Sequence, residues 1–260
     1  MIKSLDNGMC VDSAYFDISK AFDSVRHDYL LKKLSCIGIS GFTLRWITDY
    51  LQNRTQMVNV NGQLSSDRRV SSGVIQGSVL GPVFFVIFIN DVDQCIKNSS
   101  ILKYADDIRI YRSFKSDTTS QCENSTLFQD DINALTNWSK IWDLKFNIHK
   151  CCILHFGRSN IRSDYIINGF PLKSKNQEKD LGLLFSVNFK FDHHIDSIVR
   201  KANQQLGIIS RVFKNKNSQT ILPLYKTFVR PFLEYNSVIW SPYTIQNDKK
   251  LKEYKKRCVN

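Results

Sequence analysis

The segment AYFDISKAFD, residues 14–23, places an acid, Asp17, inside an apolar run of the β type. A second segment, YADD at residues 104–107, has two acids at a tight turn between apolar stretches that we expect to be short strands. Acids at the ends of neighbouring strands lie close together once the sheet has formed. These two segments are the places in the sequence that carry chemistry.

Adjacent acids such as Asp106 and Asp107 are electrostatically costly, because two like charges held side by side repel each other. A folded protein tolerates such a pair mainly where a divalent cation neutralises it. Carboxylate oxygens suit Mg²⁺ and Mn²⁺, which bind through a few carboxylates, water and substrate phosphates. The other interpretation is ordinary turn chemistry at a water-exposed hairpin tip, and the pair alone does not decide between the two.

The composition is that of a folded and basic protein. The 260 residues include 36 Lys and Arg against 24 Asp and Glu, which gives a formal net charge of +12. With 42% hydrophobic and 12% aromatic residues the chain can bury a core, which excludes a mainly disordered or low-complexity protein. The positive charge favours a polyanionic partner, either nucleic acid or an anionic membrane surface.

The cysteines and the apolar segments bear on the compartment. The seven cysteines form no CxxC pair, so the sequence contains neither a zinc ribbon nor a disulfide framework. Residues 1–10 lack the apolar run of a signal peptide, and the densely apolar stretch 83–89 is too short to cross a bilayer. We therefore expect an intracellular protein, in the cytoplasm, the nucleus or both, with no membrane partner.

The charge is concentrated near the C-terminus. Residues 190–260 contain 14 Lys and Arg against five Asp and Glu, whereas the rest of the chain has 22 against 19. Such a shift in composition indicates a domain boundary. We place one domain at 1–188, which contains the β-type segments, and a basic helical region at 189–260.

The hydrophobic pattern predicts an α+β chain. Asn61-Gly62 predicts a hairpin turn between extended runs at 55–60 and 67–71. The other expected strands are 14–18, 101–105, 108–112, 151–156, 165–167 and 181–186. The expected helices are 28–37, 40–53, 80–95, 127–142, 193–213, 218–235 and 247–257.

Several motifs together resemble one protein family. FDISKAFD at 16–23, GVIQGSVLGP at 73–82 and YADD at 104–107 are similar, in order and spacing, to motifs A, B and C of the reverse transcriptases of non-LTR (LINE-type, jockey-like) retrotransposons. WDLKFNIHKCCILHFG at 142–157 resembles motif D of that family. Segments at 178–207 and 224–243 are similar to its thumb-side regions.

The resemblance implies a fold and an activity. The fold would be an α+β polymerase palm, an antiparallel sheet with packed helices, followed by a helical thumb-like region. The activity would be RNA-directed DNA synthesis, by two-metal nucleotidyl transfer from dNTPs to the 3′ hydroxyl of a DNA primer on an RNA template. The competing interpretation is a non-catalytic RNA/DNA-binding remnant of such an element. The basic helices beyond Lys190 are either solvated faces or a grip on the RNA/DNA backbone.

The resemblance also implies a metal site. Asp17 and Asp106 match the two metal-holding aspartates, Asp107 is the third acid, and the carbonyl of Ile18 is a further ligand. The cofactor would be Mg²⁺ or Mn²⁺. Asp23 has a simpler interpretation as a helix-start or surface acid.

Further residues are assigned to substrate by the same resemblance. Phe22 corresponds to the steric gate that favours dNTPs, although a lone aromatic is also an ordinary core residue. Gln76 and Gly77 belong to motif B, where glycine lets the backbone approach template and nucleotide, and Ile75 replaces the usual proline. Lys150 fits the motif D lysine, a general acid for the pyrophosphate, or is a solvated surface lysine.

Two further expectations concern alternatives and truncation. His149, Cys151, Cys152 and His155 resemble a zinc site only superficially, because adjacent cysteines on a strand point to opposite faces, and we expect core packing instead. Only 16 residues precede Asp17, whereas the family's fingers lie upstream of motif A. We therefore expect a truncated copy with the fingers largely missing, which by itself incorporates dNTPs poorly.

Overall fold

The protein has two compact units. The structure is a computed structural model that describes residues 1–214, 217–242, 244, 247–249 and 251–252. Unit 1 comprises Met1–Lys175 and unit 2 comprises Asn176–Asn260. The boundary between the two compact units therefore lies earlier in the chain than the boundary between residues 188 and 189 that the charge distribution predicts. Because the two criteria measure different properties, the functional division at 188 stays a prediction.

Unit 1 is built on a five-stranded sheet with the order β11-β8-β1-β7-β6. Its strands pair antiparallel except for β11, which runs parallel to β8. This sheet and its helices confirm the expected α+β class. The five strands are β1 (Cys10–Asp17), β6 (Ser100–Tyr104), β7 (Asp107–Phe114), β8 (Cys152–Phe156) and β11 (Lys173–Lys175).

Helices and short strands complete unit 1. The helices are α1 (Ile2–Asp6), α2 (Ala21–Ser24), α3 (His27–Cys36), α4 (Gly41–Leu51), α5 (Leu80–Ile89) with the 3₁₀ turn η1 (Asn90–Cys95), and α6 (Thr118–Ile141). The short strands are β2 (Thr55–Gln56), β3 (Asn59–Val60), β4 (Gln63–Leu64), β5 (Arg68–Arg69), β9 (Ile166–Ile167) and β10 (Phe170–Pro171).

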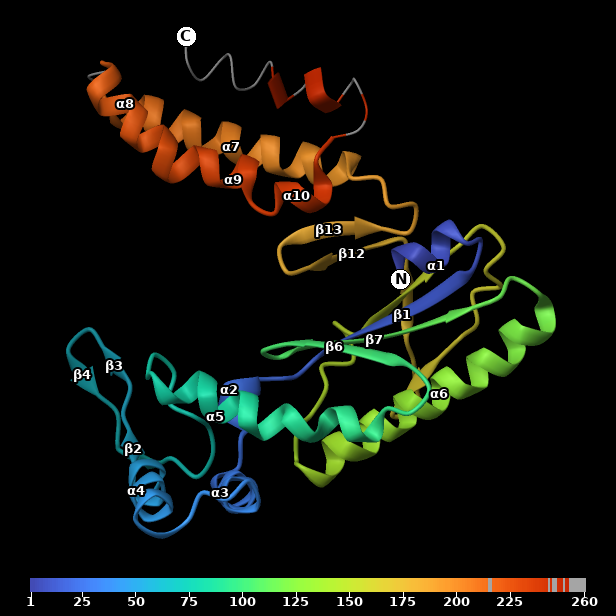
Figure 1. The fold of residues 1–260 in the computed structure, drawn as a ribbon. Coiled ribbons are helices and arrows are strands. Elements are labelled where there is room, and N and C mark those ends of the chain that lie inside the picture. The colour runs from blue at the N-terminus through green and yellow to red at the C-terminus, as the bar shows by residue number, and fades with distance from the viewer. Residues whose placement is uncertain (215–216, 243, 245–246, 250, 253–260) are drawn as a thin grey trace. The chain divides into compact units, whose positions relative to one another are not determined.

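The core of unit 1 lies between one face of the sheet and the helices α5 and α6 (Figure 1). Alternation along β1 turns Ala14 and Phe16 into this core, where they join Ile108 and Ile110 of β7. Asp17, one residue after Phe16, is only half-buried. The apolar face therefore fixes the register that carries Asp17 to the other side of the sheet.

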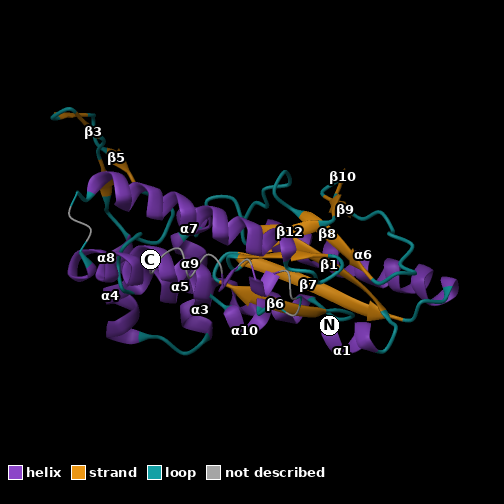
Figure 2. Ribbon diagram, turned by 90° about the horizontal axis from the view of Figure 1, so that it is seen from above, coloured by secondary structure: helices purple, strands orange, loops and turns teal. Residues whose placement is uncertain are grey.

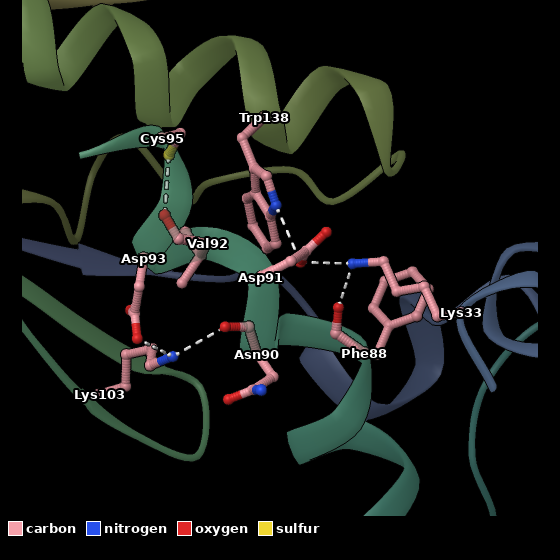
Figure 3. Close-up of polar contacts among 9 residues, drawn as sticks. All are labelled: Lys33, Phe88, Asn90, Asp91, Val92, Asp93, Cys95, Lys103 and Trp138. Atoms are coloured by element: carbon pink, nitrogen blue, oxygen red, sulfur yellow. Dashed lines mark hydrogen bonds and ion pairs between the residues drawn. The ribbon is translucent and has the colours of Figure 1, made fainter. Parts of the chain in front are cut away.

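A buried lysine connects the helices beneath the sheet (Figure 3). The Lys33 ammonium of α3 donates to Asp91 Oδ1 at 2.6 Å and to the carbonyl of Phe88, and it lies 3.7 Å from the centroid of the Trp142 ring. Trp138 Nε1 of α6 donates to the same Asp91 oxygen at 3.1 Å. Burial lowers the pKa of Lys33, and the Asp91 carboxylate opposes that shift. The contacts join α3, α5 and α6 through one charged pair.

The expected hairpin is present between α4 and α5. Val60 pairs with Gln63 across Asn61-Gly62, and Thr55 pairs with Arg69 farther from the turn. Both turn residues have positive φ, 52° and 87°, as the dipeptide requires. Figure 2 shows this ribbon projecting from the helices that flank it.

Unit 2 is a hairpin followed by helices. Its elements are β12 (Gln177–Asp180), β13 (Leu183–Ser186), α7 (Asp192–Val212), α8 (Ser218–Leu224), the π-helical turn η2 (Tyr225–Val229), α9 (Arg230–Glu234) and α10 (Ser237–Trp240). Ile195, Ile198, Val229, Leu233 and Trp240 form its core. Pro223 and Pro231 flank the π turn, where their missing N–H groups interrupt the α ladder.

Three expectations need correction or restriction. Helix α6 begins at Thr118, nine residues before the expected start at 127, because the Asp117 side chain caps it at Ser120 N and the polar first turns carry no apolar period. Strand β1 begins at Cys10 rather than 14. The helix expected at 247–257 falls largely outside the described residues.

No helix in the described part of the chain is long and apolar enough to cross a membrane.

Candidate active site

Two strand ends bring the expected carboxylates together. Asp17, the last residue of β1, pairs in register with Asp107, the first residue of β7. Tyr104 pairs with Asp107 across a two-residue turn, which contains Ala105 and Asp106. Ala105 has φ 51°, in the left-handed region that costs a non-glycine residue about 1 kcal/mol. Strain of this kind is concentrated at functional sites, so the turn is a candidate for one.

Lys150 contacts one of these carboxylates, that of Asp17. Its Nζ donates to Asp17 Oδ1 at 3.2 Å, and its side chain is 64% exposed against 28% for Asp17. The backbone explains the meeting: Asn147 N donates to the Asp17 carbonyl at 2.8 Å, and Lys150 N donates to the Asn147 carbonyl at 2.9 Å. The turn that carries Lys150 is therefore anchored to the residue that its side chain contacts.

The donor chemistry at this end of the sheet fits a divalent cation. Directly opposite residues of an antiparallel pair have Cα atoms about 5 Å apart, so Asp17 and Asp107 can direct carboxylate oxygens to one point. As the side chains stand, no group of three His, Cys, Asp or Glu within the described residues is arranged to hold a metal ion. Ile18 is buried and bridged to Phe146. The four-residue metal site stays a prediction.

Motif A and motif B residues meet in a second contact. Gln76 Nε2 donates to Asp23 Oδ1 at 2.9 Å, and Val74 N donates to the carbonyl of Phe22 at 2.7 Å. The Phe22 ring stacks on Phe85 of α5 at 5.0 Å between centroids. The sequence favoured the interpretation of Asp23 as a helix-start or surface acid. It is exposed in the first turn of α2, but it also holds the side chain of Gln76.

Gly73 is needed where these two segments approach. Its φ is +98°, and a Cβ added there would lie 3.1 Å from Asp23 Cα and 3.2 Å from the Asp23 carbonyl oxygen. We expect Gly73→Ala to lower the free energy of unfolding by about 2 kcal/mol more than Gly38→Ala. Gly38 has a similar φ of +95° with nothing within 4 Å of its added Cβ, so it controls for backbone strain alone. Urea unfolding measures both variants, and equal losses would contradict the close contact.

Basic residues line two adjoining cavities beside this contact. The cavities have volumes of about 920 and 610 Å³ and share Lys20, Arg69 and Ser72. The larger adds Lys145 and Arg26, the latter paired with the lining acids Asp28 and Asp143, and the smaller reaches Asp23 and Gln76. Sequence reasoning missed these cations because they come from separate segments, and no local pattern marks them. Their charge suits phosphate groups.

Three of the four residues considered for zinc, Cys151, Cys152 and His155, are buried in the core. Cys151 and Cys152 are fully buried, and burial raises the pKa of the Cys151 thiol, which disfavours the thiolate that zinc needs. His155 Nδ1 contacts Asp12 Oδ1 at 2.8 Å. His149 is exposed. Core packing was the expected interpretation, and the burial of the cysteines agrees with it.

The sequence matches a known family over most of its length. A family model described as "Reverse transcriptase (RNA-dependent DNA polymerase)" matches residues 10–220. Two similar Drosophila melanogaster proteins are the RNA-directed DNA polymerase from mobile element jockey and the probable RNA-directed DNA polymerase from transposon BS. Each is 26% identical to this chain, over 92% and 100% of it respectively. The chain spans only 27% and 30% of their lengths.

Solved structures show a similar fold. Telomerase from Candida tropicalis superposes with a TM-score of 0.51 in its apo form, at 13% identity, covering 96% of this chain and 42% of that one. The same enzyme in complex with a fragment of telomeric RNA gives a TM-score of 0.50, covering 99% and 40%. These superpositions show that the chain is similar to the two structures in fold.

Proposed function

The chain belongs to the reverse transcriptase (RNA-dependent DNA polymerase) family, and from that membership we propose that it adds dNTPs to a DNA primer on an RNA template. The family match together with the similar fly proteins, from mobile element jockey and transposon BS, confirms the resemblance to non-LTR retrotransposon reverse transcriptases. The observation that carries the proposal is the pairing of Asp17 with Asp107 at the strained Tyr104–Asp107 turn. It supports a carboxylate centre where the family motifs require one.

Asp17, Asp106 and Asp107, with the carbonyl of Ile18, are the proposed holders of Mg²⁺ or Mn²⁺. Such ions, when bound, activate the primer hydroxyl and neutralise the triphosphate. Lys150 is proposed to protonate the leaving pyrophosphate. Its ammonium contacts Asp17 at 3.2 Å in an exposed ion pair. Because exposed ion pairs contribute little free energy, the Lys150 side chain can leave Asp17 and contact an arriving phosphate at small energetic cost.

Phe22 and Gln76 are proposed to contact the nucleotide. The Phe22 ring is backed by Phe85, which limits its movement and suits a steric gate against a ribose 2′ hydroxyl. The Asp23 carboxylate orients the Gln76 amide, and Gly77 has φ +79°, which an L side chain rarely adopts. The lining of the cavities by Lys20 and Arg69 supports triphosphate or backbone binding beside them.

Single-turnover nucleotide addition tests the proposal. The chain, in excess over a labelled DNA primer annealed to RNA, is mixed with one dNTP and Mg²⁺ or Mn²⁺. We expect slow extension, in keeping with the poor incorporation predicted for this chain by itself, and only with the dNTP complementary to the next template base and a divalent cation. A chain that binds the primed RNA but adds no nucleotide would contradict the proposal and would favour a non-catalytic RNA/DNA-binding protein.

The basic face of α7 is proposed to grip the nucleic-acid backbone. Ile195, Ile198 and Ala202 turn into the core of unit 2, which leaves basic residues of the helix exposed. We expect replacement of Arg200, Lys201 and Arg211 by glutamine to lower the log–log salt slope of primed-RNA binding by about 2 to 3. The charge-conserving swaps Arg200→Lys, Lys201→Arg and Arg211→Lys should leave the slope unchanged. A slope unaltered by the glutamines would remove α7 from the interface.

A further inference from the structure

The hairpin between α4 and α5, residues 54–69, has no packing partner. Every residue from 52 to 69 is exposed. The four short strands of this hairpin pair only with one another, β2 with β5 and β3 with β4. A two-stranded ribbon surrounded by water is marginally stable. Such a ribbon gains stability from whatever it binds.

Its far half carries exposed apolar side chains. Met57, Val58, Val60 and Leu64 are 54%, 63%, 62% and 63% exposed. Val60 pairs with Gln63 and Asn59 pairs with Leu64, so Val60 and Leu64 are neighbours along the ribbon but point to its two opposite faces. Apolar side chains gathered on an exposed element indicate a contact surface.

Its base carries a surplus of positive charge. Arg54, Arg68 and Arg69 lie there, and Asp67 is the sole acid of the segment. Arg69 donates to Asn53 Oδ1 at 3.4 Å, and Arg54 lies 5.9 Å from the Tyr50 ring. Among the described residues, none of the three arginines has a carboxylate in ion-pair contact. The charge is therefore available to an anion.

The base of the hairpin shares a cavity with Gln76, one of the residues proposed to contact the nucleotide. The cavity of about 610 Å³ has Arg54 and Arg69 in its wall, and the same wall includes Asp23 and Gln76. A strand of nucleic acid leaving that cavity would meet the arginines first and the apolar half next. A bound strand would thus contact charged residues near the cavity and apolar residues farther out along the hairpin.

We propose that residues 54–69 bind unpaired RNA, with phosphates on the three arginines and base faces on the apolar side chains. An unpaired strand is favoured because base faces are hidden inside a duplex, which offers only phosphates, sugars and groove edges to a protein. The inference rests on the proposed function for its choice of nucleic acid as the occupant. It concerns binding and does not depend on nucleotide addition.

Two triple variants of the full chain test this assignment. Arg54→Gln, Arg68→Gln and Arg69→Gln together should raise the Kd for a short unstructured RNA on the order of 10-fold and lower the log–log salt slope by about 2. Val58→Ser, Val60→Ser and Leu64→Ser together should raise the same Kd about fivefold with the slope unchanged, because they remove apolar contact and no charge. Affinity for blunt duplex RNA should not respond to the serine variant.

A matched control removes the same charge elsewhere. Lys32→Gln, Arg158→Gln and Lys173→Gln replace three exposed cations of unit 1 outside the hairpin and should leave the slope near that of the parent. If the parent binds RNA and both hairpin variants bind equally well, the inference is wrong while the proposed function stands. If the parent binds no RNA, the proposed function itself fails. If the serine variant changes only the oligomeric state seen by light scattering, the hairpin is a self-association surface and the assignment is overturned.

Discussion

Asp17→Asn is expected to reduce the rate of templated dNTP addition at least about 100-fold, which corresponds to roughly 3 kcal/mol of barrier. The substitution keeps the size of the side chain and removes the negative charge that faces Asp107 and Lys150. A neutral amide neither holds a divalent cation as a carboxylate does nor retains the ion pair with Lys150. Asp106→Asn should have a comparable effect, because that residue occupies the strained turn beside Asp107.

Two measurements separate a metal role from a structural one. Calorimetric titration with Mn²⁺ should give weaker binding to Asp106→Asn and Asp17→Asn than to the parent, while the Kd for primed RNA stays unchanged. Asp49→Asn, an exposed acid on α4, serves as the control and should alter neither the rate nor the metal affinity. Equal Mn²⁺ affinities for the parent and both variants would contradict the assignment of these carboxylates as ligands.

The residues that sequence alone located are those whose chemistry is local. FDISKAFD and YADD contain their acids within short strand-and-turn segments, which the apolar pattern located, and the family resemblance then predicted that Asp17 would lie beside the YADD turn. The Asn61-Gly62 turn was found for the same reason, because its φ angles are a property of the dipeptide.

The contacts that the sequence did not reveal join segments distant along the chain. Gln76 meets Asp23 across 53 positions, and the cavity cations Lys20 and Arg69 come from separate elements. The early start of α6 was missed because its first turns are polar and only the Asp117 cap marks them. Tertiary packing decides such features, and a single sequence carries no periodic signal of it.

The same limit applies to Asp12, whose buried carboxylate is the acceptor for three side chains. It is 1% exposed, and Tyr165 Oη and Asn160 Nδ2 donate to it at 2.5 and 2.8 Å. His155 Nδ1 lies 2.8 Å away and must donate, since a carboxylate only accepts. Burial, and then the Asp12 charge, raise the pKa of Tyr165, which keeps the phenol protonated as a donor.

Asp12→Ala is expected to lower the free energy of unfolding of unit 1 by about 3–5 kcal/mol, because it leaves buried donors without their acceptor. Hydrogen exchange of β1 and β8 amides across a urea series reports on unit 1 by itself. Asp49→Ala, at an exposed position, should cost less than about 0.5 kcal/mol. Tyr165→Phe removes one of the stranded donors, so the double variant should lose less than the sum of the two single losses. Strict additivity, or a loss for Asp12→Ala as small as that for Asp49→Ala, would show that the three donors find other acceptors.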